Sequence, residues 1–243
     1  MSGALVFLHG VGGAGRIWQP QVDHFAGRHN VLAWDAPGYG GRALGAEVSF
    51  KAMAAQLAED MDQAGMASAS IIGHSFGGMV AQQLVQDFPE RVQHLILSGT
   101  SPAFGRPDGD FQQKFIAART KPLDAGKTMA DVAAAVAPGL VGRRAPASAV
   151  ELAIDCMSQV PETTYRAVIA ALTRFDLRAN LPNIACPTLL IAGSEDNTAP
   201  AGMMERMASR IPGAQFTVME GAGHLAPIEQ PDRFNTIVEE FIA

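Results

Sequence analysis

The sequence predicts an α/β domain with a mainly parallel sheet, covered by helices on both faces and interrupted by a helical insertion. Six short apolar runs, bounded by Gly, Pro, Asp or Ser, alternate with amphipathic segments along most of the 243 residues. The runs are apolar throughout instead of at every second position, as expected for parallel strands buried on both faces. One long stretch between the fourth and fifth runs has helix signals but no strand pattern, which indicates the insertion.

The expected elements follow one another as strand, helix, strand. The expected strands are residues 4–9, 30–35, 70–75, 94–99, 187–193 and 215–220. Helices are expected at 51–64, at 78–88 (ended by Pro89) and from Asp232 onward, because each segment repeats apolar residues every four positions. Pro20 is expected in the first turn of an earlier helix.

The insertion covers residues 105–180 and divides the core into residues 1–104 and 181–243. Thr128 with Asp131, and Ser148 with Glu151, both fit a capping residue followed by an acid three positions later, so each predicts a helix start. The apolar side chains of this region are expected to line a hydrophobic pocket or to pack on the core: Phe104, Phe111, Phe115, Met129, Val136, Leu140 and Met157.

Composition excludes several classes of protein. The net charge of −6 leaves no basic stripe for nucleic acid, and no apolar run is long enough to cross a membrane. Spacings typical of a metal site are lacking, so no metal is expected. Cys156 and Cys186 are expected to be free thiols in a reducing compartment, the cytoplasm. The start lacks a basic segment and a cleavage site, so it is expected to be the first strand of the mature protein.

A candidate nucleophile lies in Gly73-His74-Ser75-Phe76-Gly77, a G-x-S-x-G pattern. The pattern directly follows a predicted strand and directly precedes a predicted helix, the setting of a nucleophile elbow. Small neighbours allow the tight turn, and the amino end of the helix points free N–H groups at developing negative charge. Ser75 is therefore the predicted nucleophile.

The base and its orienting acid are expected beyond later strands. His224 lies in "GAGHLAPIEQP", a glycine-rich loop at the carboxyl end of the last strand, where ligands gather in open α/β sheets. Asp196 lies in "AGSEDNTAP" after the fifth strand, with Glu195 as its rival, and the order Ser, Asp, His is that of α/β hydrolases. The other histidines are expected at the surface (His24, His29), at a strand start (His94), pointing away from the Ser75 oxygen (His74), or supporting the first loop (His9).

The glycine-rich loop at Gly10, Gly12 and Gly15 has two interpretations. The glycines spell G-x-G-x-x-G, and Asp35 follows about twenty residues later, as in a dinucleotide-binding site. However, the helix there is expected to begin only near Pro20, and such a site would leave Ser75 unexplained. We therefore expect no nucleotide cofactor, and a loop whose backbone N–H groups stabilise an oxyanion.

Several segments together resemble the α/β-hydrolase superfamily: "FLHGVGG", "WDAPGYG", "GHSFGG", "PERV", "PTLLIAGSED" and "GAGHLAPIEQP". Within it, the chain is similar to small esterases, β-ketoadipate enol-lactonases and meta-cleavage hydrolases. The resemblance implies an α/β-hydrolase fold, with Ser75, Asp196 and His224 as catalytic triad, the N–H groups of Val11 and Phe76 as oxyanion hole, and the insertion as a helical cap. Cofactors and metals are not implied.

The chain departs from the family pattern twice. Members usually have a β-hairpin before the strand that ends at His9, so the sheet is expected to lack its outermost strands. The family's G-x-S or G-x-G-x-S segment after the aromatic-glycine turn is replaced by "GYGGRA", in which Arg42 is expected to be a solvated loop residue or, alternatively, to face the cap.

The predicted function is hydrolysis of a small carboxylic ester or lactone through an acyl-enzyme. One alternative is a carbon–carbon bond hydrolase, and another is a non-catalytic small-molecule receptor on the same fold. Arg119, Arg143 and Arg144 are candidates to bind a substrate carboxylate, or are solvated.

Overall fold

The computed structural model describes residues 3–105 and 109–243, and its centre is a six-stranded sheet. All neighbouring strands are parallel, in the order β2-β1-β3-β4-β5-β6. The strands are β1 (Ala4–Leu8), β2 (Asn30–Trp34), β3 (Ala69–His74), β4 (Val92–Ser98), β5 (Thr188–Gly193) and β6 (Gln215–Met219). Each agrees with a predicted strand to within two residues at either end, so the predicted fold class is confirmed.

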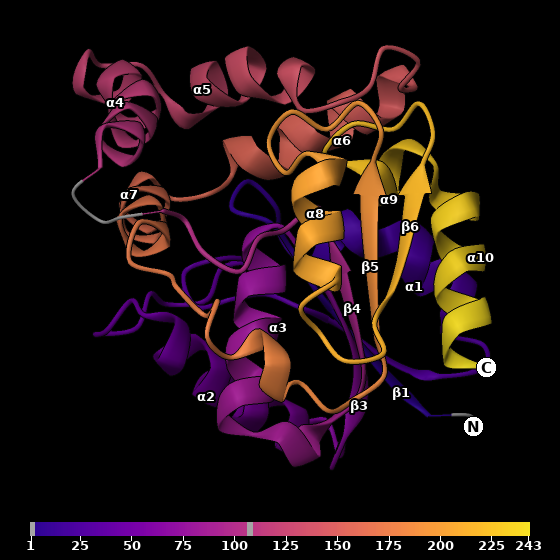
Figure 1. The fold of residues 1–243 in the computed structure, drawn as a ribbon. Helices are drawn as coiled ribbons and strands as arrows, with labels where there is room; N and C mark the ends of the chain where they lie inside the picture. The colour runs from indigo at the N-terminus through magenta and orange to yellow at the C-terminus, as the bar shows by residue number, and fades with distance from the viewer. Residues whose placement is uncertain (1–2, 106–108) are drawn as a thin grey trace.

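Helices cover both faces of the sheet (Figure 1). The first group contains α1 (Gln19–Phe25) and α10 (Pro231–Ile242), and the opposite group contains α2 (Phe50–Gln63), α3 (Phe76–Asp87) and α8 (Ala201–Ala208). Short elements complete the core: η1 (Gly15–Trp18), η2 (Pro89–Arg91), η4 (Leu181–Asn183) and α9 (Ala226–Glu229). Pro20 lies in the first turn of α1, as predicted.

The strands are buried on both sides because two hydrophobic layers enclose them. Leu5 and Phe7 of β1 pack with the α1 and α10 side, whereas Val6 and Leu8 pack with the side of α2 and α3. This alternation explains why the strands are continuously apolar in sequence. On the side where outer strands were expected to be lacking, β2 forms the sheet edge, with η1 and α1 packed against it.

In the described part of the segment between β4 and β5 lie four α-helices: α4 (Asp110–Asp124), α5 (Met129–Val136), α6 (Ala147–Ser158) and α7 (Glu162–Leu172), with η3 (Ala137–Gly139) after α5. Figure 1 shows α5 and α6 across the carboxyl ends of the strands. An antiparallel bridge between Ala103 and Asp176 brings the two ends of this segment together. The segment between β4 and β5 therefore leaves the core and returns to it at one place.

Three local predictions in the loops and helices have clear outcomes. Thr128 and Asp131 form a reciprocal capping box at the start of α5, as predicted. The predicted cap at Ser148 is wrong, because α6 begins one residue earlier, after Pro146, and its first turn has no side-chain cap. Arg42 is only partly solvated: its side chain is 34% exposed, and its guanidinium pairs with Asp60 on α2.

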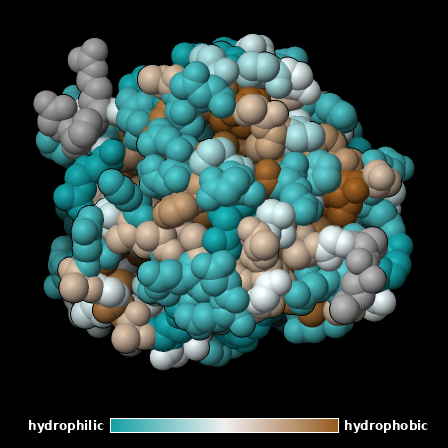
Figure 2. Space-filling view, turned by 90° about the horizontal axis from the view of Figure 1, so that it is seen from below, coloured by the Kyte–Doolittle hydropathy of each residue, from teal (hydrophilic) through white to brown (hydrophobic). Residues whose placement is uncertain are grey.

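Figure 2 shows the molecule from below Figure 1, on the side where the strands begin. Hydrophilic side chains dominate this face, and hydrophobic ones form small separate groups. Cys156 and Cys186 are free thiols, as predicted. Within the described ranges, every helix is too short or too polar to cross a membrane.

Candidate active site

Ser75 sits on a strained turn between β3 and α3. Its backbone has φ 52° and ψ −116°, and it is the one non-glycine residue with positive φ in the described part of the chain. The turn closes only because its neighbours are glycines. A Cβ on Gly73 would lie 2.6 Å from the Gly77 carbonyl oxygen, and a Cβ on Gly77 would collide with the Leu8 carbonyl of β1. Strain of this kind is stored where a side chain must be presented for function.

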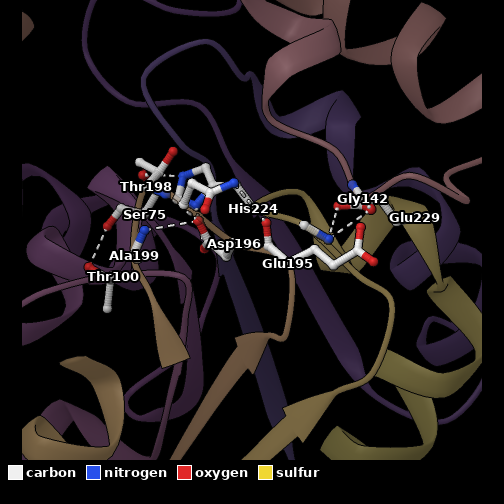
Figure 3. Close-up of polar contacts among 11 residues, drawn as sticks. Ser75, Thr100, Gly142, Glu195, Asp196, Thr198, Ala199, His224 and Glu229 are labelled. Atoms are coloured by element: carbon white, nitrogen blue, oxygen red, sulfur yellow. Dashed lines mark hydrogen bonds and ion pairs between the residues drawn. The ribbon is translucent and has the colours of Figure 1, made fainter. Parts of the chain in front are cut away.

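His224 joins this serine to a buried acid (Figure 3). Its Nε2 lies 3.1 Å from Ser75 Oγ, and its Nδ1 lies 2.8 Å from Asp196 Oδ2. The carboxylate can only accept, so Nδ1 carries the proton and donates it. Nε2 is then free to accept from the serine hydroxyl, which is the state required of a general base. The three residues predicted from distant parts of the sequence are therefore brought together.

Asp196 is fixed by more than the histidine. Its Oδ1 accepts from the backbone N–H groups of Thr198 and Ala199, at 2.7 and 2.9 Å, and its side chain is fully buried. Burial alone would raise the pKa of Asp196, but the bond to His224 and these N–H donors outweigh it and lower the pKa. The carboxylate therefore stays ionised against the imidazole.

Glu195, the rival acid, faces another partner. Its carboxylate accepts from the Arg143 backbone N–H at 2.8 Å and from the Arg143 guanidinium at 3.0 Å. This pairing anchors the segment after β5 to the loop before α6. The geometry therefore distinguishes two adjacent acids that the sequence alone left as rivals.

The loop that carries His224 is held by Glu229 on α9, a residue that sequence reasoning missed. The buried Glu229 carboxylate accepts from the N–H groups of Gly142, at 2.7 Å, and Gly223, at 2.9 Å (Figure 3). Burial raises the pKa of Glu229. The His224 N–H also donates to the Leu140 carbonyl at 2.7 Å. The "IEQP" segment contained this acid, but only the fold shows that it faces inward.

His74 lies against His224, with 4.8 Å between ring centroids, and both rings line one cavity. The prediction that His74 points away from this site is therefore wrong. Burial, together with the neighbouring His224, lowers the pKa of His74 to about 3. His74 is therefore neutral, because a buried positive charge on His74 beside the His224 ring would be strongly disfavoured.

The predicted oxyanion donors are the N–H groups of Val11 and Phe76. The carbonyl oxygens of the same two peptide groups, those of Gly10 and Ser75, are fixed by hydrogen bonds. The Gly10 carbonyl accepts from Gly13 N–H at 2.9 Å and from His9 Nδ1 at 2.8 Å. The Ser75 carbonyl accepts from Thr100 Oγ1 at 2.7 Å. In a trans peptide the N–H points opposite to its C=O, so these bonds aim the N–H groups of the next residues, Val11 and Phe76, the other way.

His9 has a fixed, neutral protonation state. Its Nδ1 donates to a carbonyl, and its Nε2 accepts from Ala36 N–H at 3.2 Å. Burial lowers the pKa of His9. The expectation that His9 supports the first loop is confirmed by these contacts.

A cavity of about 140 Å³ opens above Ser75. Its lining is mainly apolar, as in sites that bind small organic ligands. Five of the apolar residues predicted for the pocket line it: Phe104, Phe115, Val136, Leu140 and Met157. Phe111 is exposed instead, and Met129 packs in the core. Val11, Tyr165 and Arg119 also line the cavity.

Parallel strands, a strained serine and a histidine–aspartate pair at their carboxyl ends define a class of α/β enzymes. The model of the Alpha/beta hydrolase family matches residues 5–237, and the chain belongs to this family. The similarity runs through the whole domain, with the segment between β4 and β5 included.

Several relatives are similar over nearly the whole chain. RutD of Stutzerimonas stutzeri, assigned as a carbamate hydrolase, is 31% identical over 98% of this chain and 91% of its own. The pimeloyl-[acyl-carrier protein] methyl ester esterase of Aeromonas hydrophila is 29% identical over 98% of this chain and 94% of its own. The structure of a thermophilic esterase from Thermogutta terrifontis superposes with a TM-score of 0.89 at 26% identity, covering 99% of this chain and 90% of the other.

Proposed function

We propose that the protein is a serine hydrolase that cleaves a small carboxylic ester or lactone through an acyl-enzyme. Ser75 is the nucleophile, His224 the general base and Asp196 the acid that orients it. The observation that carries the proposal is the continuous hydrogen-bonded chain from Ser75 Oγ through His224 to the buried Asp196.

The chemistry follows from this chain in two steps. Ser75 Oγ attacks the substrate carbonyl carbon while its proton passes to His224 Nε2, and the carbonyl oxygen becomes an oxyanion. The N–H groups of Val11 and Phe76 stabilise that charge, and each such donor contributes roughly 3–4 kcal/mol. His224 returns the proton to the leaving alkoxide, and water then hydrolyses the acyl-enzyme by the same route.

The choice of ester or lactone as substrate rests on two supports. The cavity walls are mainly apolar, which suits a small acyl or alkyl group. Relatives over the full length include an esterase of an acyl-carrier-protein methyl ester, and a structural relative is also an esterase. Esters and lactones present the reactive carbonyl that the Ser75 arrangement requires.

The nucleophile is tested with a fluorophosphonate probe and p-nitrophenyl butyrate. We expect a covalent adduct on Ser75, found by mass spectrometry of peptides, and ester turnover that disappears in Ser75→Ala. Ser158→Ala is the matched control, because the Ser158 hydroxyl donates to the Asp155 carbonyl and does not line the cavity. Turnover that survives in Ser75→Ala would contradict the assignment.

The same assay separates the alternatives. A meta-cleavage dienoate and an aryl carbamate are added to the panel, and each is compared between wild type and Ser75→Ala. Dienoate cleavage without ester turnover would replace the proposal with a carbon–carbon hydrolase, and carbamate turnover alone would replace it with a carbamate hydrolase. Ligand-induced thermal stabilisation without any turnover would indicate a receptor.

A further inference from the structure

Two long polar side chains in the cavity wall have no role in the proposed chemistry. Arg119 comes from α4 and Tyr165 from α7, and both line the cavity together with Ser75. Helices α4 and α7 pack against each other, and the charge of Arg119 acts on the pKa of the Tyr165 hydroxyl. The two groups therefore form one polar spot in a mainly apolar wall.

Neither group has a polar partner within the described ranges. The Arg119 guanidinium lies over the ring of Phe115, 3.6 Å from its centroid, and makes no ion pair or hydrogen bond there. Tyr165 is 2% exposed, and its hydroxyl also has no recorded acceptor or donor. Acidic side chains do not occur among the described residues that line the cavity.

The two other candidate arginines are different. Arg143 already has a carboxylate partner in Glu195, and its side chain is 89% exposed. Arg144 is exposed and does not line the cavity. Of the three arginines considered from the sequence, the structure therefore leaves Arg119 as the one that faces the reaction chamber without an acid.

Arg119 is partly buried, with the Phe115 ring on one side of its guanidinium. Burial also lowers the pKa of Arg119, and an anion would stabilise a charge partly removed from water. A guanidinium is the donor that best fits a carboxylate, because its planar fork gives two parallel hydrogen bonds. A phenol hydroxyl adds a third donor without adding charge.

We infer that Arg119 and Tyr165 bind a carboxylate of the substrate, so that the preferred ester or lactone carries a free acid group separated from its reacting carbonyl by an apolar chain. This inference rests on the proposed function, and it names the substrate class for the same site. The apolar chain would run along the wall formed by residues such as Leu172 and Met157.

The test compares acidic and neutral esters of equal length. Monomethyl esters of the dicarboxylic acids from succinate to suberate are paired with the corresponding neutral methyl esters, and release of acid is followed by pH-stat. We expect a lower KM for at least one acidic ester than for its neutral partner. Arg119→Met should raise that KM by roughly 10- to 100-fold and leave the neutral ester within a few-fold.

Further variants separate charge from packing. Arg119→Lys keeps the charge but loses the fork, so it should restore part of the preference, and Tyr165→Phe should raise the KM of the acidic ester several-fold. Arg144→Met is the matched control and should change nothing. Equal KM values for acidic and neutral esters in the wild type, or an equal loss for both in Arg119→Met, would overturn the inference while leaving the hydrolase proposal intact.

Failure of the proposed function would be a different result. If no ester is hydrolysed, binding of adipate to wild type and to Arg119→Met is measured by calorimetry. Saturable binding that the variant loses would support the carboxylate site independently of catalysis. Absence of binding by this dicarboxylate and by the whole series would overturn it.

Discussion

Replacing Asp196 with asparagine should reverse the tautomer of His224. One side-chain oxygen, Oδ1, accepts from the N–H groups of Thr198 and Ala199, at 2.7 and 2.9 Å, so an asparagine must keep its oxygen there. Its NH₂ group then takes the place of Oδ2 and donates toward His224 Nδ1. The imidazole proton moves to Nε2, which faces Ser75 Oγ at 3.1 Å as a donor and can no longer take the serine proton.

The size of the effect follows from the cost of restoring the active tautomer. With the proton back on Nδ1, two donors face each other in a buried site, and each donor without an acceptor costs about 1–3 kcal/mol. A total of about 2–6 kcal/mol corresponds to a fall in kcat of roughly 30-fold to 10⁴-fold. A reversed tautomer in a Ser-His-Asp triad is known to cost about 10⁴-fold, at the upper end of this range.

The assay is kcat and KM for p-nitrophenyl butyrate at neutral pH in Asp196→Asn. Glu195→Gln is the matched control, because it makes the same acid-to-amide change one residue earlier and loses only the Arg143 pairing. We expect full activity within a few-fold in Glu195→Gln. If Asp196→Asn keeps kcat within threefold of wild type, or if Glu195→Gln is the variant that loses activity, the reasoning on the triad is wrong.

Three further predictions concern positioning and stability. Thr100→Val removes the hydroxyl that holds the Ser75 carbonyl, so kcat for p-nitrophenyl butyrate should fall by up to roughly 10-fold with KM unchanged; an unchanged kcat would contradict it. Gly77→Ala should lower the free energy of unfolding in urea by about 1–3 kcal/mol because its Cβ meets a β1 carbonyl. Gly202→Ala, an open helical position, should be neutral or stabilising, and equal effects would refute the steric reason. Burial raises the pKa of Asp60, but Arg42 and other donors outweigh it and keep the pKa below 3.8. Asp60 therefore contributes stability above about pH 4, and this contribution is lost as pH falls through the folded pKa. In urea, Asp60→Asn should have a lower free energy of unfolding than wild type at pH 7, and the difference should shrink as pH falls below about 4; a difference that does not shrink would contradict this.

The strands were predictable because their signal is local. A parallel strand buried on both faces reads as a nearly continuous apolar run, as in β3 and β5, and the alternation of such runs with helical patterns indicates a parallel sheet. The positions of Ser75, Asp196 and His224 follow from the same logic. Each comes after a strand, and parallel strands end at one edge, so the topology alone brings these side chains near one another.

Predictions from local sequence were wrong or incomplete where two local patterns overlapped, or where a residue distant in sequence determined the contacts of a side chain. Ser148 with Glu151 has the capping pattern, but Pro146 occupies the cap position in extended backbone and α6 begins at Ala147, so Ser148 already lies inside the first turn. Arg42 has no local sign of a partner, and only the packing of α2 brings Asp60 to it. His74 alternates away from Ser75 in an ideal strand, but the turn at φ 52° breaks that alternation.

Specificity was the least predictable part because it depends on how the helices between β4 and β5 pack. Arg119, Arg143 and Arg144 are equivalent in the sequence, and nothing local says which one faces the cavity. The fold separates them through their partners. Arg143 is held outside by the acid next to Asp196, whereas Arg119 lies on α4 against an aromatic ring and faces inward. The core therefore places Ser75, Asp196 and His224 at one edge of the sheet, and the packing of α4 on α7 determines which arginine faces the cavity.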